Sequence, residues 1–169
     1  MPPRYITGDV RRSTSSFHPQ ITNVPLTSSQ ELARIMKSDR QPHKDYVVVD
    51  VRDNDRIGGH ILHSHHSPSA DFLDSVNDLV EKTKDVPTVI FHCALSQARG
   101  PKAARIFAET CDNLRVEGKH PSQDICILRG GFTDFQAKFR DDPKLIEKWN
   151  AEIWAADWSS GVLAGSSRV

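Results

Sequence analysis

The sequence contains little cysteine and no long apolar run. Three cysteines among 169 residues are an odd, small number, which argues against a disulfide framework. No apolar run approaches the roughly 18 residues that a membrane span needs, and the N-terminus has no apolar core of the signal-peptide type. We therefore expect a soluble cytoplasmic protein with reduced thiols, for which entry into the nucleus stays open.

A surplus of charge is also missing. The 22 Lys and Arg residues balance 22 Asp and Glu residues, so the formal net charge is zero. Without a basic surplus, the sequence has no nucleic-acid footprint and no electrostatic membrane anchor. We expect neither nucleic acid nor a membrane as a partner, and the composition leaves the oligomeric state open.

Both ends of the chain differ in composition from its middle. Residues 1–22 are rich in proline, serine, threonine and arginine and predict a mobile N-terminal arm. Residues 159–169 are rich in serine and glycine and predict a flexible tail. A single folded domain, large enough to bury a core, is therefore expected over 23–158.

Within this domain, strand and helix patterns alternate. The β-branched run around Val47–Val51 is typical of a strand buried on both faces, whereas apolar residues from Phe72 to Val80 recur at helical spacing. The main predicted elements are a strand over 46–51, a helix over 70–84, a strand over 89–92, a helix over 100–112 and a strand over 125–128. This alternation predicts an α/β fold with a central, mostly parallel sheet and helices on both faces.

Shorter signals complete the prediction. Thr27-Ser-Ser-Gln30 fits a capping box that opens a short helix. Ile61-Leu62 predicts the start of a short strand, and the phenylalanines over 132–139 predict one more helical stretch. Pro143 is suited to open a last helix that runs through Trp149.

The most informative segment runs from Thr88 to Pro101. An apolar run leads to Cys93, five residues separate Cys93 from Arg99, and a helical pattern begins after Gly100. The segment therefore predicts a strand, a loop and a helix. Backbone N–H groups of such a loop and of the helix N-terminus attract an oxyanion and stabilise a thiolate. A thiolate that faces an oxyanion held by a guanidinium is the chemistry of cysteine-dependent phosphoryl transfer.

Three ordered motifs carry a family resemblance. They are His92-Cys93 with Arg99-Gly100-Pro101, Val48–Asp53 followed by Gly58–Ile61, and Ile127–Phe132. Together they resemble the M-phase inducer phosphatases, and still more closely the small fungal and plant members of that family and the eukaryotic arsenate reductases. The resemblance implies a rhodanese-like three-layer α/β fold in which 23–158 is the catalytic domain.

The resemblance also implies roles for the loop residues. Cys93 is expected to be the nucleophile and Arg99 the oxyanion clamp. The alternatives are a buried core cysteine and a surface arginine, although a cation at a helix N-terminus is unfavourable without an anion beside it. The expected oxyanion-binding loop comprises Ala94, Leu95, Ser96, Gln97, Ala98 and Arg99, and the expected supporting residues are Asp50, His92 and Gly100. Whether the Ser96 hydroxyl donates to the thiolate or belongs to an ordinary loop serine is left open.

Two alanines depart from the resembled pattern. The M-phase inducer enzymes have glutamates at the positions of Ala94 and Ala98, where they are proposed to help proton supply; the arsenate reductases lack them. We expect a phosphatase that acts on phosphotyrosine-like aryl phosphates through a phosphocysteine, without a cofactor. The alternative is a thiol-dependent arsenate reductase that uses glutathione and glutaredoxin as reductants. Further alternatives are a sulfurtransferase, which the seven-residue loop disfavours, and a non-catalytic binding module.

The remaining histidines and cysteines predict no metal site. On a strand, His63 and His65 would share one face while His60 and His66 would share the other, which splits the set. Cys126 alternates within a predicted strand and is assigned to the core. For Cys111, core packing and a resolving thiol both stay open. The only expected partner is a phosphorylated substrate or a small oxyanion.

Overall fold

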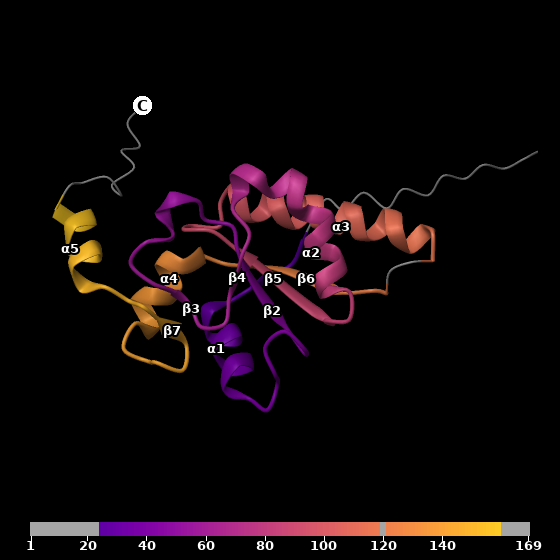
Figure 1. Ribbon diagram of the computed structural model, residues 1–169. Coiled ribbons are helices and arrows are strands. Elements are labelled where there is room, and N and C mark those ends of the chain that lie inside the picture. Colours follow the sequence, from indigo (N-terminus) through magenta and orange to yellow (C-terminus); the bar gives the residue numbers. More distant parts are fainter. Residues whose placement is uncertain (1–23, 119–120, 160–169) are drawn as a thin grey trace, which may run out of the picture.

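One parallel sheet lies between two layers of helices in a computed structural model that describes residues 24–118 and 121–159 (Figure 1). Its strands lie in the order β1-β6-β5-β2-β4, and every neighbouring pair is parallel. The strands are β1 (Leu26–Thr27), β2 (Val47–Asp50), β4 (His65–His66), β5 (Thr88–His92) and β6 (Asp124–Leu128). The predicted α/β class with a central parallel sheet is confirmed.

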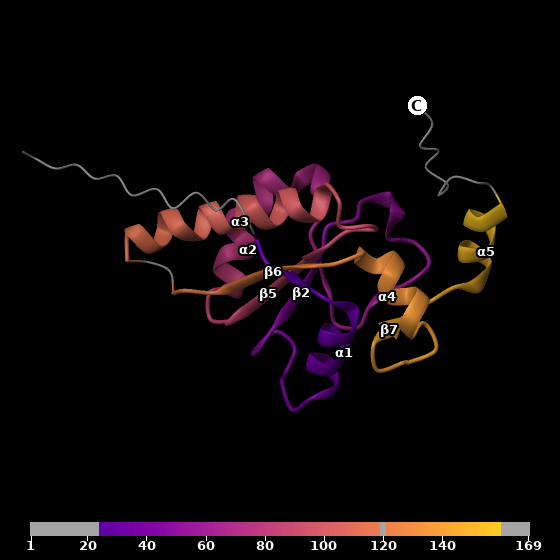
Figure 2. The ribbon, with the colours of Figure 1, turned by 180° about the vertical axis from the view of Figure 1, so that it is seen from behind.

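Two pairs of helices cover the two faces of this sheet (Figures 1 and 2). Helices α2 (Phe72–Thr83) and α3 (Arg99–Val116) pack on one face, and α1 (Ser29–Lys37) and α4 (Gly131–Phe139) pack on the other. In β2, Val47 and Val49 join the core on the α2–α3 side, whereas Val48 joins the core on the α1–α4 side. Because both faces are covered, all four residues of β2 are buried, which explains the β-branched run.

The segments outside the main sheet correct two predictions. The strand predicted at Ile61-Leu62 is β3 (His60–Ile61), and it pairs with antiparallel β7 (Ile146–Glu147) in a separate two-stranded sheet. The prediction that Pro143 opens a helix through Trp149 is wrong, because Ile146 is buried in the pairing with β3 and the next helix, α5, is Ala151–Ser159. Two 3₁₀ turns, η1 (Asn54–Arg56) and η2 (Ser69–Asp71), complete the element order.

The helix ends also differ from the sequence pattern. The capping box of α1 lies one residue later than predicted: the Ser28 hydroxyl accepts the Glu31 N–H at 3.1 Å, and the Glu31 carboxylate accepts the Ser28 N–H at 2.8 Å. Helix α3 runs to Val116, beyond the predicted end at 112. The N-terminal arm over 1–22 and the tail beyond Ser159 lie outside the described residues, so both stay predictions. None of the helices in the described ranges is long and apolar enough to span a membrane.

Candidate active site

Cys93 lies where β5 ends and the turn into α3 begins. Since the sheet is parallel, the carboxyl ends of β2 and β5 meet at one edge, where Asp50 is in register with His92. Cys93 is only 3% exposed, and α3 begins at Arg99. We call residues 93–99 the catalytic loop, after the role that the sequence predicts for Cys93 and Arg99. The strand, loop and helix predicted from the sequence are thus present, with the cysteine and the arginine at the two ends of the loop.

The catalytic loop folds back onto the cysteine. The Ser96 N–H donates to Cys93 Sγ at 3.2 Å, and the Ser96 hydroxyl accepts the Cys93 N–H at 3.4 Å. Ser96 has a φ of 53°, a left-handed conformation that turns the chain back toward the sulfur. The open question about Ser96 therefore has a structural answer: its amide, and not its hydroxyl, donates to the sulfur.

The first residues of α4 donate hydrogen bonds to the loop backbone. The Phe132 N–H donates to the Cys93 carbonyl at 2.9 Å, and the Thr133 N–H donates to the Ala94 carbonyl at 3.0 Å. Gly131 has a φ of 58°, and a Cβ at this position would lie 2.4 Å from the Ala94 carbonyl oxygen. The third sequence motif thus contains a glycine that lets two backbones approach closely, a contact that the sequence reasoning did not assign.

Arg99 is bound by two carboxylates from the η1 segment. Its Nη1 lies 2.7 Å from Asp55 Oδ1 and 3.1 Å from Asp53 Oδ2, and its Nη2 lies 2.5 Å from Asp55 Oδ2. The hydrogen bond with Asp55 is the main cause of a raised pKa at Arg99 and of a lowered pKa at Asp55. Sequence reasoning missed Asp55; the only signal was the pair of acidic residues that follows the Asp50-Val-Arg52 motif.

A buried charge network lies beneath the loop. Asp50 is fully buried and receives hydrogen bonds from Arg52 Nε at 3.0 Å, Arg52 Nη2 at 2.7 Å and Arg56 Nε at 3.1 Å. Burial alone would raise the pKa of Asp50, but His92 together with the hydrogen bonds and charge of Arg52 lowers it below the ordinary value. Asp50 is therefore an ionised carboxylate whose oxygens already accept hydrogen bonds, and it is not a proton donor.

His92 is fully buried beside this network. Its Nδ1 lies 3.1 Å from the Cys93 carbonyl oxygen, and its Nε2 lies 3.8 Å from Asp50 Oδ2 without a hydrogen-bond partner among the described residues. Burial lowers the pKa of His92. Gly100 packs close to the same turn, since a Cβ there would lie 3.4 Å from the Cys93 nitrogen. Both residues thus contact the backbone of the turn that carries the Cys93 sulfur.

The four clustered histidines do not lie on one strand. Strand β3 ends at Ile61, His63 has a φ of 60° in a turn, and β4 begins at His65, so the predicted alternation of their faces is wrong. His60 pairs with Glu147 at 3.1 Å, and His66 Nε2 lies 2.7 Å from the Arg52 carbonyl. Within the described ranges, no three His, Cys, Asp or Glu side chains gather in a way that could hold a metal ion.

Neither of the other cysteines lies beside Cys93. Cys111 is about 18 Å along the axis of α3 from Arg99, and burial raises its pKa to about 12. Cys126 is in register with Ile90, about 10 Å along β5 from Cys93. The geometry therefore favours core packing for Cys111 over a resolving role, and a disulfide with Cys93 would need a partner from another molecule.

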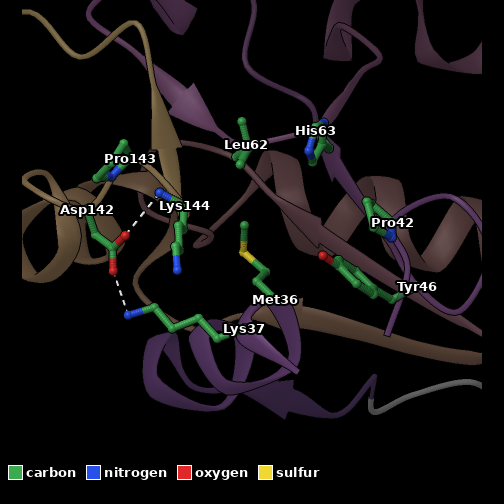
Figure 3. A pocket seen from close by; sticks show the side chains of 9 residues that line it. All are labelled: Met36, Lys37, Pro42, Tyr46, Leu62, His63, Asp142, Pro143 and Lys144. Atoms are coloured by element: carbon green, nitrogen blue, oxygen red, sulfur yellow. Dashed lines mark hydrogen bonds and ion pairs between the residues drawn. The ribbon is translucent and has the colours of Figure 1, made fainter. Parts of the chain in front are cut away.

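A separate pocket lies at the opposite end of the sheet. Its volume is about 700 Å³, and Tyr46, which directly precedes β2, lines it. The Tyr46 hydroxyl points toward the Met36 side chain in this pocket, and Asp142 bridges Lys37 and the Lys144 N–H (Figure 3). Because Cys93 follows the carboxyl end of β5, this pocket is distinct from the catalytic loop.

The comparisons with known proteins show the family of the chain. The model of the rhodanese-like domain matches residues 28–138, so the chain belongs to the rhodanese-like domain family. The dual specificity phosphatase Cdc25 of Arabidopsis thaliana is 37% identical over 113 residues, which cover 66% of this chain and 72% of the relative.

Two solved structures are also similar. The yeast protein tyrosine phosphatase Ygr203w has 32% identity and a TM-score of 0.64, with 79% of this chain and 99% of that chain covered. The As-Sb reductase of Leishmania major has 27% identity and a TM-score of 0.61, with 83% and 99% covered. The family resemblance and the rhodanese fold are confirmed, and the names of these relatives support an enzyme of the phosphatase and arsenate reductase group.

Proposed function

We propose that the chain is a cysteine-dependent phosphatase that acts on phosphotyrosine-like aryl phosphates. The observation that carries this proposal is the catalytic loop: Cys93 and Arg99 stand at its two ends, and the Ser96 amide donates to the sulfur at 3.2 Å. Donors already aimed at a sulfur can equally serve an oxyanion that arrives there. Leu95, which is 42% exposed in the loop, adds apolar surface suited to an aryl group.

In the proposed reaction, the Cys93 thiolate attacks phosphorus in line with the leaving oxygen. The S–P bond forms while the P–O bond breaks, and the leaving oxygen departs with the electron pair. Water then attacks phosphorus and breaks the S–P bond, which releases phosphate and restores the thiolate. Arg99 and the loop amides stabilise the negative charge on the non-bridging oxygens throughout.

Thiol-dependent arsenate reduction is the second candidate, and the lack of an acid in the loop favours it. Cys93 would displace water from arsenate, which carries its own protons. A glutathione thiolate would then attack the Cys93 sulfur, and arsenic would leave with the electron pair as arsenite. The remaining disulfide between Cys93 and glutathione would be reduced by glutaredoxin, in agreement with the distance of Cys111 and Cys126 from Cys93.

A side-by-side assay tests both candidates. Purified protein is given an aryl phosphate in one reaction and arsenate with glutathione and glutaredoxin in the other. Cys93→Ser serves as the inactive variant, and Cys126→Ser is a matched cysteine control on the other side of the sheet. Phosphate release by the wild type and by Cys126→Ser supports the phosphatase, arsenite formation supports the reductase, and the absence of both contradicts the proposal.

A further inference from the structure

Three of the five N–H donors of the Arg99 guanidinium are already engaged. The Asp55 carboxylate binds the end of the guanidinium fork, which Nη1 and Nη2 form, with its two oxygens 2.7 Å from Nη1 and 2.5 Å from Nη2. Asp53 accepts the second donor of Nη1 at 3.1 Å. The two donors that remain are on Nε and Nη2, and they form the side edge of the fork. This edge has the spacing that binds two oxygens of a tetrahedral oxyanion.

The two carboxylates are themselves anchored. Asp53 accepts hydrogen bonds from the Ser69 hydroxyl at 2.6 Å and from the Ala70 N–H at 3.0 Å. Asp55 accepts the Asp53 N–H at 3.0 Å. Arg99 is therefore held by partners that the fold has already fixed, so less side-chain entropy is lost when the guanidinium binds a ligand.

We propose that Asp55, assisted by Asp53, is a positioning residue that holds the end of the Arg99 guanidinium and presents its Nε–Nη2 edge to the oxyanion. This inference rests on the proposed function of the catalytic loop. The loop has no carboxylate of its own for this task, since none of residues 93–99 is an aspartate or a glutamate. The positioning groups come instead from the η1 segment.

The opposite interpretation is that the carboxylates compete with the substrate for Arg99. Competition would require the oxyanion to displace Asp55 from the end of the fork. The side edge needs no such displacement, because Nε donates to no acceptor within residues 24–118 and 121–159. The Arg99 side chain is also 32% exposed, so a ligand can approach it. The geometry therefore favours positioning.

The first experiment compares Asp55→Asn and Asp55→Ala with Asp78→Ala, a control that removes an acidic charge from the exposed face of α2. Phosphate binding is measured as protection of Cys93 from alkylation, and kcat and KM are measured on an aryl phosphate. We expect both Asp55 variants to weaken phosphate protection and to lower kcat/KM by roughly 10- to 100-fold, because a misaligned guanidinium loses its paired hydrogen bonds. Asp78→Ala should match the wild type.

A double-mutant cycle with Arg99→Ala separates positioning from a general structural role. If Asp55 acts through Arg99, then Asp55→Ala should cause no further loss in the Arg99→Ala background. Independent, additive losses would overturn the inference, and so would tighter phosphate binding in Asp55→Asn, which would identify a competitor. Wild-type-like kinetics in both Asp55 variants would overturn this inference but would leave the proposed function standing. A wild type that neither turns over nor binds phosphate would overturn the proposed function as well.

Discussion

At the scale of single residues, the proposed chemistry depends on the Cys93 sulfur. We predict that Cys93→Ser abolishes turnover but preserves the fold and oxyanion binding. A serine hydroxyl can still accept the Ser96 N–H, and the loop amides and Arg99 are unchanged. Activity on an aryl phosphate and the phosphate-dependent rise in melting temperature measure the two halves of this prediction. Ordinary turnover by a pure Cys93→Ser preparation would remove this cysteine from the mechanism.

Gly131 provides a second test at the same scale. We predict that Gly131→Ala destabilises the protein by at least about 2 kcal/mol more than Gly118→Ala does, and that it also lowers activity. Both glycines have a positive φ, but a Cβ at Gly131 would lie 2.4 Å from the Ala94 carbonyl, whereas nothing lies within 4 Å at Gly118. Denaturant unfolding of the two variants isolates the steric effect from the backbone strain. Equal stability of the two variants would contradict it.

Individual residues were predictable from the sequence where the neighbouring chain carried the signal. Cys93 and Arg99 lie within one strand–loop–helix pattern, so their positions at the ends of one loop followed from local spacing. The Asp55–Arg99 contact joins residues that are far apart in the chain and depends on the path of the η1 segment, which no local periodicity encodes. The same holds for the close approach of Gly131 to the loop.

At the scale of elements, the buried network of Asp50 joins β2 to the segment that follows it. We predict that Asp50→Asn costs about 3–5 kcal/mol of stability, because it leaves the buried Arg52 and the nearby Arg56 without their shared anion. Urea unfolding at neutral pH measures this cost. The variant Asp45→Asn, in an exposed turn, is the control and should change stability far less.

The pH dependence of stability follows from the same network. The pKa of Asp50 is lower in the folded state than its ordinary value, so its contribution is fully present above about pH 4 and is lost as the pH falls toward the folded pKa. We therefore predict that wild-type stability falls more steeply with acid than that of Asp50→Asn. If the free energy of unfolding of the two proteins falls equally with acid, this assignment of the pH dependence to Asp50 is wrong.

Elements were predictable where burial and periodicity agreed. The sequence patterns of three strands and one helix are long enough to indicate whether the segment is a strand or a helix. These elements are β2, β5, β6 and α2. The helix predicted after Pro143 is absent because Leu145 and Ile146 are buried where β7 pairs with β3. A pairing of only two residues has no periodic pattern in the sequence, so it could not be predicted. Thr27 and Ser28 are each followed three residues later by Gln30 or Glu31, so both fit a capping box, and the helix begins after Ser28, the stronger N-cap of the two.

At the scale of the whole molecule, the fold gathers three segments at the carboxyl edge of the sheet. Asp53 contacts both η2 and the start of α3, so the segments around Asp53, Ser69 and Arg99 are held together. Each segment carries one exposed large apolar residue: Ile57 is 63% exposed, Leu73 is 66% exposed and Leu95 is 42% exposed. Exposed apolar side chains on these segments favour an aryl ester as the proposed substrate over an inorganic ion, which has no apolar part to bury.

The carboxylates near the loop are already bound by other residues, and this leads to a prediction for the substrate. Asp50 is bound by two arginines, Asp53 and Asp55 have lowered pKa values beside Arg99, and Asp134 is tied to Ser29 and Lys138. None of these four carboxylic acids is therefore poised to protonate a leaving group. We predict that the rate of the chemical step falls steeply as the pKa of the leaving phenol rises, and that phosphoserine peptides react roughly 10²–10⁴-fold more slowly than acidic aryl phosphates.

Arsenate should escape this limit, because it can supply its own proton and lose water. A series of aryl phosphates with graded phenol pKa, measured in single turnover, tests the prediction, and arsenate reduction by the same preparation is the comparison. A flat dependence on the phenol pKa would reveal a general acid. Asp53→Asn would then be the first variant to make, since the Asp53 carboxylate contacts Arg99 Nη1 at 3.1 Å and leaves the Nη1–Nη2 end of the guanidinium to Asp55. A steep dependence with rapid arsenate reduction would place the chain among enzymes whose substrate, and not the protein, supplies the proton.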